Sequence, residues 1–290
     1  MIQWYVYAIG AAVFATLFEI FRKKALSKVH AMNFESARTI FMVLLCLFLI
    51  PFISLSFDKI NMFLVYLTSL LAAIGILYAA KAFRHGDISL ITPLSNLRPA
   101  FIAIIAVIFL SESLSKTQIT GIAVLFATAY LLAADHHISS FIAPIKHFIK
   151  SKYSLYFLFA TFLFAVTAVL DKFIITNKIT NIFTYFFFVW IFLAINLNII
   201  HALTHGIKET FACIKKTRYL AFIVAVFSFI SNLLALKALS MAYVSLVMPI
   251  VMLSTLLVVL FGGRYFHEKG LLPRVLISIL MLIGAYLVIV

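Results

Sequence analysis

The sequence predicts an all-α integral membrane protein that crosses the bilayer ten times. Hydrophobic residues make up 65% of the 290 positions and charged residues 11%, whereas a soluble domain carries roughly 25% charged residues. The mean hydropathy is +1.18. A single soluble core cannot remove this much apolar surface from water, but the hydrocarbon of a bilayer can.

Ten apolar stretches approach the length of about 20 residues that a helix needs to cross the hydrocarbon. They lie at 4–21, 35–56, 62–83, 88–110, 117–134, 153–173, 183–203, 218–239, 244–263 and 271–290. Several of the polar breaks between them are only a few residues long, which indicates antiparallel helical hairpins. Strands are not expected, because a membrane barrel needs shorter segments of alternating polarity.

The two halves of the chain resemble each other at a fixed shift of 156 positions. At this shift Lys81, Pro93 and Glu112 fall on Lys237, Pro249 and Glu268, and Ala129-Tyr130-Leu131 falls on Ala285-Tyr286-Leu287. Lys, Pro, Glu and Tyr are uncommon in so apolar a chain, which gives their agreement weight. We therefore predict a first five-helix repeat at 1–134, a connecting loop at 135–152 and a second five-helix repeat at 153–290.

The odd number of spans in each predicted repeat has a functional consequence. Two successive repeats of five spans must enter the membrane in opposite orientations. Inverted repeats are characteristic of secondary transporters, whose two nearly equivalent shapes open in turn to opposite sides of the membrane. The predicted fold is therefore two inverted five-helix repeats, and the predicted class of function is a carrier.

Basic residues account for the formal net charge of +14. In a soluble protein this excess would suggest a nucleic-acid partner, but no nucleic-acid-binding motif is present, and the hydropathy favours the lipid bilayer as partner. Lys and Arg, with Arg22 and Arg38 counted among them, are concentrated in the loops after the first, third, fifth, seventh and ninth spans. Because positive residues stay on the cytoplasmic side, these odd-numbered loops are predicted to be cytoplasmic. One of them contains Cys213, Lys215 and Lys216.

The stretch from Tyr78 to Leu132 carries several short motifs in a fixed order. They are Ala79-Ala80-Lys81-Ala82, Ser89-Leu90-Ile91-Thr92-Pro93-Leu94, Leu110-Ser111-Glu112-Ser113-Leu114 and Gly121, and the second half repeats them at Ala235-Leu236-Lys237-Ala238, Ser245-Leu246-Val247-Met248-Pro249 and His267-Glu268. In these motifs the chain resembles the EamA domain of the drug/metabolite transporter superfamily. The second copy departs from the pattern, with His267 where a small residue is usual and Ile277 where a glycine is expected.

The resemblance implies a multi-pass transporter of small organic molecules in a cell inner (plasma) membrane. Family substrates include amino acids, other metabolites and drug-like cations, and many members are exporters. We expect amino acids or related metabolites as substrates and export as the direction. A flippase or exporter of lipid-linked or drug-like substrates is the close alternative. Because both repeats are on one chain, a monomer is expected to be functional, with a dimer as the alternative.

Arg98 is the sharpest candidate for substrate binding. It lies in the fourth predicted span, between two prolines and near Asn96, and prolines free backbone carbonyls by breaking helices. Broken helices near the midplane commonly form substrate sites, and a guanidinium there can hold a carboxylate or phosphate with two hydrogen bonds. The alternative is a bracing role, in which Arg98 pairs with Glu19, with Asp171 or with backbone carbonyls.

Further polar residues of the predicted spans are candidates for the walls of a cavity that would suit a zwitterion. They are Tyr78, Trp190, Asn196, Asn198, Ser228, Ser231 and Asn232. Ser254 is added because it matches Arg98 in the other half. The alternative for all of them is that they join neighbouring helices by hydrogen bonds.

Four ionisable residues are candidates for proton coupling or for a gate: Glu19, Asp171, Lys81 and Lys237. A carboxyl group can couple protons when burial raises its pKa, but Glu19 and Asp171 also have basic neighbours in the sequence with which to form a salt bridge. Lys81 and Lys237 lie near helix ends, from which long side chains reach the lipid headgroups. For both lysines we favour a structural or gate role.

Glu112 and Glu268 lie in short turns that precede a predicted helix. An acidic side chain in such a turn accepts hydrogen bonds from free backbone amides and complements the positive end of the helix dipole. We expect both glutamates to be structural.

A membrane-embedded enzyme and a structural scaffold are the competing classes of function. An enzyme would need a catalytic pattern such as paired acidic metal ligands, a His-Glu-x-x-His run or an activated nucleophile, and the sequence has none of these. Neither a cofactor nor a metal site is expected, because the cysteines and histidines lack ligand spacing. A scaffold would leave the inverted duplication and Arg98 unexplained. Detectable flux of a small-molecule substrate would separate a carrier from both.

The predicted orientation can be tested at Lys215–Lys216. A protease site inserted there is expected to be cut in inside-out membrane vesicles and to be protected in intact cells, because positive residues are retained in the cytoplasm. Cleavage in intact cells would reverse the orientation.

Overall fold

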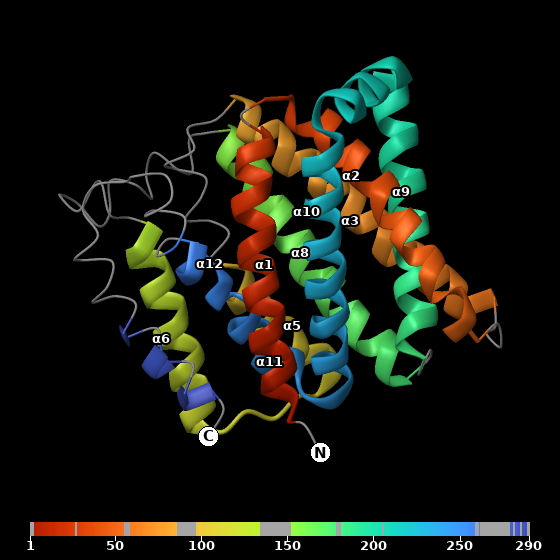
Figure 1. The fold of residues 1–290 in the computed structure, drawn as a ribbon. Coiled ribbons are helices and arrows are strands. Elements are labelled where there is room, and N and C mark those ends of the chain that lie inside the picture. Colours follow the sequence, from red (N-terminus) through yellow and green to blue (C-terminus); the bar gives the residue numbers. More distant parts are fainter. Residues whose placement is uncertain are drawn as a thin grey trace. The chain divides into compact units, whose positions relative to one another are not determined.

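The computed structural model describes residues 3–26, 28–54, 59–85, 97–133, 152–177, 181–204, 206–258, 261, 279–280, 282–284 and 286–288. Within these ranges the chain forms helices and short turns and contains no strand, as the sequence predicts (Figure 1). The elements are α1 (Trp4–Leu26), α2 (Ala31–Cys46), the 3-10 helix η1 (Leu47–Phe52), α3 (Lys59–His85), α5 (Arg98–Leu110), α6 (Lys116–Ala133), α8 (Lys152–Asn177), α9 (Ile182–Thr204), α10 (Ile207–Met241), α11 (Val244–Val251) and α12 (Leu253–Leu257).

Among the described residues, six helical segments are long and apolar enough to cross a membrane. They are α1, α2 together with η1, α3, α8, α9 and α10. Each overlaps one of the predicted spans. The remaining four predicted spans fall on the shorter helices or on residues outside the described ranges, so the number of ten stays a prediction. The connecting loop predicted at 135–152 also lies outside them, except for Lys152 at the start of α8.

The helix α10 is longer than the sequence predicts. Its 35 residues begin at Ile207, whereas the predicted span begins at 218, and they would extend over about 50 Å at 1.5 Å per residue. Since the hydrocarbon is about 30 Å thick, one end of α10 projects beyond it. Cys213 and Lys215 therefore lie on a helix and not in the expected polar loop, and Cys213 is buried.

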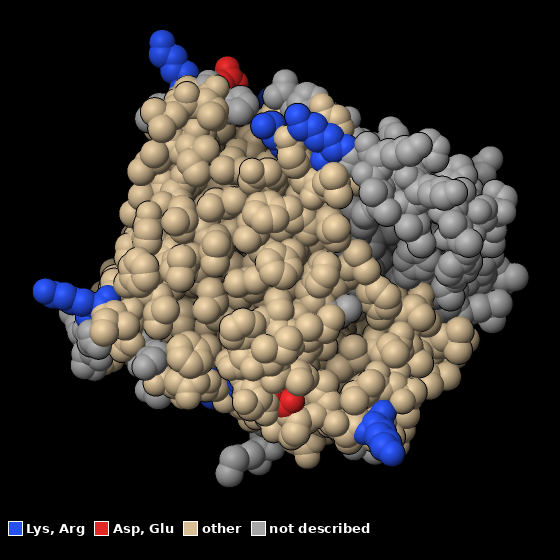
Figure 2. Space-filling model, turned by 180° about the vertical axis from the view of Figure 1, so that it is seen from behind, with Lys and Arg blue, Asp and Glu red and all other residues tan. Residues whose placement is uncertain are grey.

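The described surface is rich in large apolar side chains. Phe48 and Phe109 are each 75% exposed and Leu203 is 83% exposed. On the face shown in Figure 2, uncharged residues dominate and charged residues are few. Such exposure is unfavourable in water but is what contact with lipid requires.

Two compact units make up the chain. The first unit consists of Met1–Ala73 and Leu170–Met241, and the second consists of Ile74–Val169 and Ala242–Val290. Each unit therefore draws on both halves of the sequence, and α3 and α8 contribute to both.

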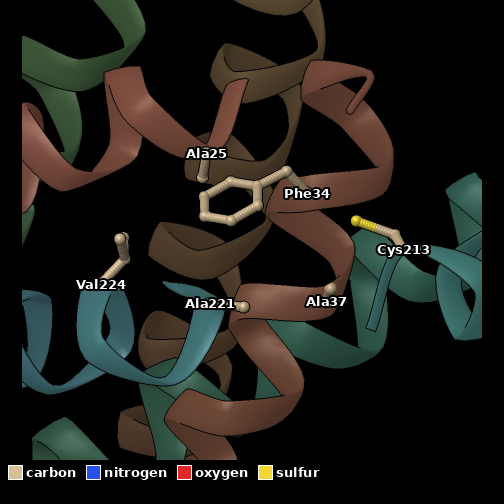
Figure 3. Close-up of a cluster of buried hydrophobic side chains, with 6 residues drawn as sticks. All are labelled: Ala25, Phe34, Ala37, Cys213, Ala221 and Val224. Carbon is tan, nitrogen blue, oxygen red and sulfur yellow. The ribbon is translucent and has the colours of Figure 1, made fainter. Parts of the chain in front are cut away.

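In the first unit, α10 packs along α1 and α2, and α2 also packs against α9. A core of small side chains around Phe34 holds α1, α2 and α10 together (Figure 3). Small residues let the backbones approach closely, which is the main source of helix association in lipid. The close approach of α1 and α10 also appears as a hydrogen bond of 2.8 Å from the Ser231 hydroxyl to the Ala11 carbonyl.

The start of α9 is fixed by Asn181. Its side-chain oxygen accepts hydrogen bonds from the amides of Phe183 at 2.9 Å and Thr184 at 3.3 Å, as an N-cap residue does. The same side chain donates to the carbonyl of Phe52 at 2.9 Å. This joins the start of α9 to the end of η1, which contains Pro51.

In the second unit, Glu112 has the structural role that the sequence suggests, but for a different helix. Its carboxylate accepts hydrogen bonds from the amides of Val244 at 2.7 Å and Ser245 at 3.2 Å, and from the Ser245 hydroxyl. Glu112 thereby caps α11. The helix that follows it in sequence, α6, is instead capped by Ser115 and Gln118, which bond to each other's backbone amides at 3.1 Å. Glu268 lies outside the described residues.

The tightest backbone approach of the second unit involves Gly121 on α6. A Cβ atom at this position would lie 2.8 Å from the carbonyl oxygen of Gly284 and 2.8 Å from the amide nitrogen of Val288. Both neighbours are backbone atoms, so they cannot move aside as a flexible side chain can. Gly121 is therefore required for this contact between helices.

We expect the substitution Gly121→Ala to lower the thermal unfolding temperature of the purified protein in detergent, because overpacking of this kind costs roughly 1–3 kcal/mol. The matched control is Ala123→Leu, which adds a larger side chain at an exposed position of the same helix. An unfolding temperature for Gly121→Ala equal to that of the control would contradict the close approach.

Candidate substrate site

A group of ionised side chains is buried among the helices of the first unit. Glu35 on α2 accepts a hydrogen bond from Nε of Arg22 at 2.8 Å and another from Nε of Arg38 at 2.8 Å. Only 6% of the Glu35 side chain and 6% of the Arg38 side chain is exposed. One buried carboxylate therefore lies between two guanidinium groups, one from α1 and one from its own helix.

This arrangement follows from the cost of burying charge. An isolated ion in an apolar interior loses several kcal/mol of solvation, and a paired, hydrogen-bonded ion recovers much of that loss. Glu35 and Arg38 are three residues apart, so they meet on one face of α2. Glu19 forms a further ion pair with Arg22 at 3.3 Å, but its side chain is 44% exposed. The salt bridge that the sequence offers as the alternative role of Glu19 is therefore present.

Aromatic and polar groups surround the Arg38 guanidinium. Its carbon Cζ lies 5.5 Å from the ring centre of Trp190 and 5.5 Å from that of Phe18. Its Nη1 donates to the hydroxyl of Ser228 at 3.2 Å. The amide of Asn232 in turn donates to the same hydroxyl at 3.3 Å and to the Ser228 carbonyl at 2.7 Å. We call Arg38, Glu35, Trp190, Ser228 and Asn232 the Arg38 cluster.

The Arg38 cluster brings together two of the predicted substrate-binding residues. Trp190 on α9 is buried and Asn232 on α10 is exposed, and Arg38 and Ser228 connect them. A guanidinium binds a carboxylate, and an indole ring binds an apolar or cationic moiety. A hydroxyl and an amide each accept hydrogen bonds from the polar hydrogens of a substrate.

Asp171 on α8 is the second polar centre of the first unit. Its carboxylate accepts a hydrogen bond from the hydroxyl of Thr68 at 2.8 Å and one from the hydroxyl of Tyr185, and the Tyr185 side chain is 1% exposed. The neighbouring Lys172 donates to the carbonyl of Leu239 at 2.7 Å. Asp171 therefore joins α3, α8 and α9, and its role in proton coupling stays a prediction.

Arg98 belongs to the second unit and is the first residue of α5. Its Nη2 donates to the carbonyl of Phe164 at 3.4 Å, and its Cζ lies 5.7 Å from the centre of the Phe164 ring. A backbone carbonyl is one of the bracing partners that the sequence suggests. The contact is compatible with both roles, since a guanidinium has five donors.

The remaining predicted residues are distributed over both units. In the second unit, Lys81 lies 5.8 Å from the ring centre of Tyr156, and the Tyr78 ring is 5.3 Å from the same ring. Ser254 is half-buried on α12, and Lys237 of the first unit is exposed on α10. Asn96 lies outside the described residues. Among the described residues, no three His, Cys, Asp or Glu side chains gather as a metal site would require.

Comparison with known proteins identifies the family. Residues 2–134 match the model of the EamA-like transporter family. These residues therefore form an EamA-like domain of the drug/metabolite transporter superfamily. The predicted resemblance is thereby confirmed for this part of the chain, and it is a resemblance to a family of multi-pass membrane proteins whose members are transporters and not enzymes.

The fold of this EamA-domain protein is shared with a protein of known crystal structure. The two are 13% identical, with a TM-score of 0.68, and the match covers 98% of this chain and 96% of the other. At this identity the similarity concerns the fold alone. None of the curated proteins compared with the chain matched it, so its substrate must be inferred from its own residues.

Sequence reasoning missed the centre of the Arg38 cluster. The charge count placed Arg22 and Arg38 with the cytoplasmic residues, whereas Arg38 is buried and Arg22 is half-buried. The available signal was the Glu35-x-x-Arg38 spacing at the beginning of an apolar stretch. An acid and a base three positions apart can satisfy each other inside a membrane protein.

We expect Glu35→Gln to destabilise the EamA-domain protein by roughly 3–5 kcal/mol, because it leaves two guanidinium groups without their shared carboxylate. Thermal unfolding in detergent measures this loss. The control is Glu19→Gln, which removes a largely solvated ion pair worth about 1 kcal/mol or less. Equal effects of the two substitutions would show that the buried pairs do not stabilise the fold.

Proposed function

We propose that this EamA-domain protein is a secondary-active carrier that exports small organic metabolites, with amino acids or related carboxylates as substrates, by alternating access. The match of residues 2–134 to a transporter family supports the class of function. The observation that carries the substrate class is the Arg38 cluster, in which a guanidinium lies against an indole ring inside a bundle of membrane helices.

The Arg38 guanidinium favours an anionic group, because it has five hydrogen-bond donors and its hydrogen bonds to Glu35 and Ser228 use two of them. Arg22 pairs with both Glu35 and Glu19, so the two arginines and two glutamates carry no net charge before a substrate binds. A substrate carboxylate can pair with Arg38 while Arg22 keeps Glu35. The Trp190 ring would then contact an apolar or ammonium portion of the substrate, and Ser228 and Asn232 would supply hydrogen-bonding groups.

Arg98 is the proposed anchor in the second unit. Like Arg38, it lies over an aromatic ring, that of Phe164. Each unit thus supplies one guanidinium supported by an aromatic side chain.

The proposed architecture is ten membrane helices in two inverted five-helix repeats, 1–134 and 153–290, joined by 135–152. The division into compact units supports it. The first unit takes Met1–Ala73 of the first half and Leu170–Met241 of the second, and the second unit takes the trailing part of each half together with the first part of α8. Such a division is expected when each of two related repeats contributes helices to both compact units.

The proposed location is the cell inner (plasma) membrane, with the odd-numbered loops in the cytoplasm and a monomer as the functional form. The projecting end of α10 supports this orientation, because Lys215, Lys216 and Arg218 are exposed there. Positive residues beyond the hydrocarbon favour the cytoplasmic side. Glu19, Asp171, Lys81 and Lys237 are retained as proposed proton-coupling or gate residues.

Counterflow in proteoliposomes, with a pool of labelled amino acids and small organic acids, tests the proposed function. We expect flux in the wild type and a loss of about tenfold or more in Arg98→Ala, since a charge-assisted hydrogen bond contributes roughly 1.5–3 kcal/mol. Trp190→Ala is also expected to lower the flux, because it removes the ring that lies against Arg38. The control variant is Phe109→Ala, at a position of α5 that is 75% exposed.

The outcomes separate the alternatives. Flux that survives Arg98→Ala would keep the carrier and leave Arg98 with a bracing role. Absence of flux for every compound of the pool, with the folded protein verified by its unfolding temperature, would remove the amino-acid assignment and favour a lipid-linked or drug-like substrate.

A further inference from the structure

A buried histidine lies outside the Arg38 cluster, near the end of α9. The side chain of His201 is 1% exposed, and each of its ring nitrogens has a polar partner. Its Nε2 is 2.9 Å from the side-chain oxygen of Asn33 on α2, and its Nδ1 is 3.0 Å from the hydroxyl of Thr210 on α10. His201 therefore connects three helices of the first unit.

The polar contacts continue in both directions from the imidazole. On one side, the amide nitrogen of Asn33 donates to the carboxylate of Glu209 at 3.1 Å. On the other side, the Thr210 hydroxyl is 3.1 Å from the Ser36 hydroxyl, which donates to the side-chain oxygen of Asn198 at 2.6 Å. We call this series, from Glu209 to Asn198, the His201 chain.

The protons of the His201 chain can be counted from one end. The side-chain oxygen of Asn33 only accepts hydrogen bonds, because its nitrogen is used by Glu209. Nε2 of His201 must therefore carry a proton and donate it to Asn33. Rotating the Asn33 amide would turn its oxygen toward the Glu209 carboxylate, where two acceptors would face each other.

Counting from the other end determines the state of Nδ1. The single hydroxyl proton of Ser36 is used on Asn198, whose nitrogen donates to the Ala194 carbonyl at 2.8 Å and to the Thr39 hydroxyl at 3.1 Å. The proton between Ser36 and Thr210 must then come from Thr210. A Thr210 hydroxyl that donates to Ser36 can only accept from His201.

Both ring nitrogens of His201 therefore donate, and the state that satisfies the whole chain is the imidazolium. If Nδ1 loses its proton, the Thr210 hydroxyl turns to it, and the 3.1 Å contact between Thr210 and Ser36 has no proton. Repairing that contact with the Ser36 proton would break the 2.6 Å bond to Asn198 instead. Deprotonation thus removes one hydrogen bond among α2, α9 and α10.

Charges around the imidazole affect this balance. The described charged and titratable groups on the elements of the first unit that contact α9 are Glu35, Arg38 and Cys46 of α2, Lys59 and Tyr66 of the first-unit part of α3, Asp171 and Lys172 of the first-unit part of α8, and Lys208, Glu209, Cys213, Lys215, Lys216, Arg218, Tyr219 and Lys237 of α10. Glu209 is joined to His201 through Asn33, whereas Glu35 and Arg38 pair with each other. His201 also lies in the last turn of α9, where the helix dipole favours a cation.

We propose that His201 is a proton-binding site of this carrier, and that release of its proton loosens the contact between α2 and α10, which the hydrogen bond from Thr210 to Ser36 joins. The inference rests on the proposed transport function for its consequence, which is a transport rate that depends on the protonation of His201. The imidazole is suited to this role because histidine gains and loses a proton within the physiological range of pH.

Nitrogen NMR of the histidine-labelled protein in nanodiscs tests the site without any transport assay. The resonances of Nδ1 and Nε2 distinguish an imidazolium from a neutral ring, and the His201 signals are those missing from His201→Gln. We expect the imidazolium pattern at neutral pH in the wild type and the neutral pattern at the same pH in Thr210→Val. A neutral His201 in the folded wild type would overturn the proposal.

Counterflow across the range of about pH 5 to 8, in which histidine titrates, tests the consequence. The wild-type rate is expected to change at least about threefold over this range, and the His201→Gln rate to lose that change. The matched control is His30→Gln, because His30 is exposed, and it should retain the wild-type profile. A His201→Gln profile equal to that of the wild type would also overturn the proposal. An imidazolium in a protein without flux would instead contradict the transport function and leave the proton site intact.

Discussion

The buried carboxylate of Glu35 fixes the relative positions of the helices in the first unit. Its two hydrogen bonds, each of 2.8 Å, require Arg22 of α1 and Arg38 of α2 to meet at one point. Arg38 in turn requires Ser228 of α10 at 3.2 Å. Packing of apolar surfaces in lipid is not specific about register, because lipid tails and side chains are equally apolar. The ion pairs supply that specificity, since a shift of one helix turn would leave a buried charge without its partner.

Other described ionisable residues also have polar partners that offset the cost of burying a charge, but the partners differ. Glu112 uses backbone amides at the start of α11, Asp171 uses the hydroxyls of Thr68 and Tyr185, and Lys172 uses the carbonyl of Leu239. Each contact joins elements that are distant in sequence. The polar contacts therefore determine which helices are neighbours. The apolar surface, in contrast, favours the bilayer over water without selecting a particular neighbour.

Hydropathy was sufficient to predict the six long spans, because each is a run of apolar residues longer than the hydrocarbon requires. It failed for the first part of α10, where Lys208, Lys215 and Lys216 lower the average although the backbone remains helical. A helix outside the hydrocarbon needs no apolar average, so its beginning could not be located. The structural role of Glu112 was predictable from its position before a helix, whereas its choice of α11 depended on the tertiary fold.

The candidate site was less predictable than the spans for a related reason. Residue type alone indicated Trp190 and Asn232. The two side chains are joined through Arg38 and Ser228, however, and a count of charges assigns Arg38 to the cytoplasmic side. Glu35 and Arg38 neutralise each other within one helical turn, so an average over a span conceals them. A search for acid and base pairs at a spacing of three or four within apolar stretches would have found this one.

The helix α2 connects the proposed substrate site with the proposed proton site. At 100° per residue, Asn33, Ser36 and Thr39 lie on one side of α2, and Glu35 and Arg38 lie on another. The first side carries the contacts with α9 and with Thr210 of α10, and the second carries those with Arg22 and Ser228. Because a helix moves as a rigid element, a change in the contacts on the first side displaces the Arg38 guanidinium on the second. The two sites are then coupled through α2 itself, and no chain of intermediate side chains is needed.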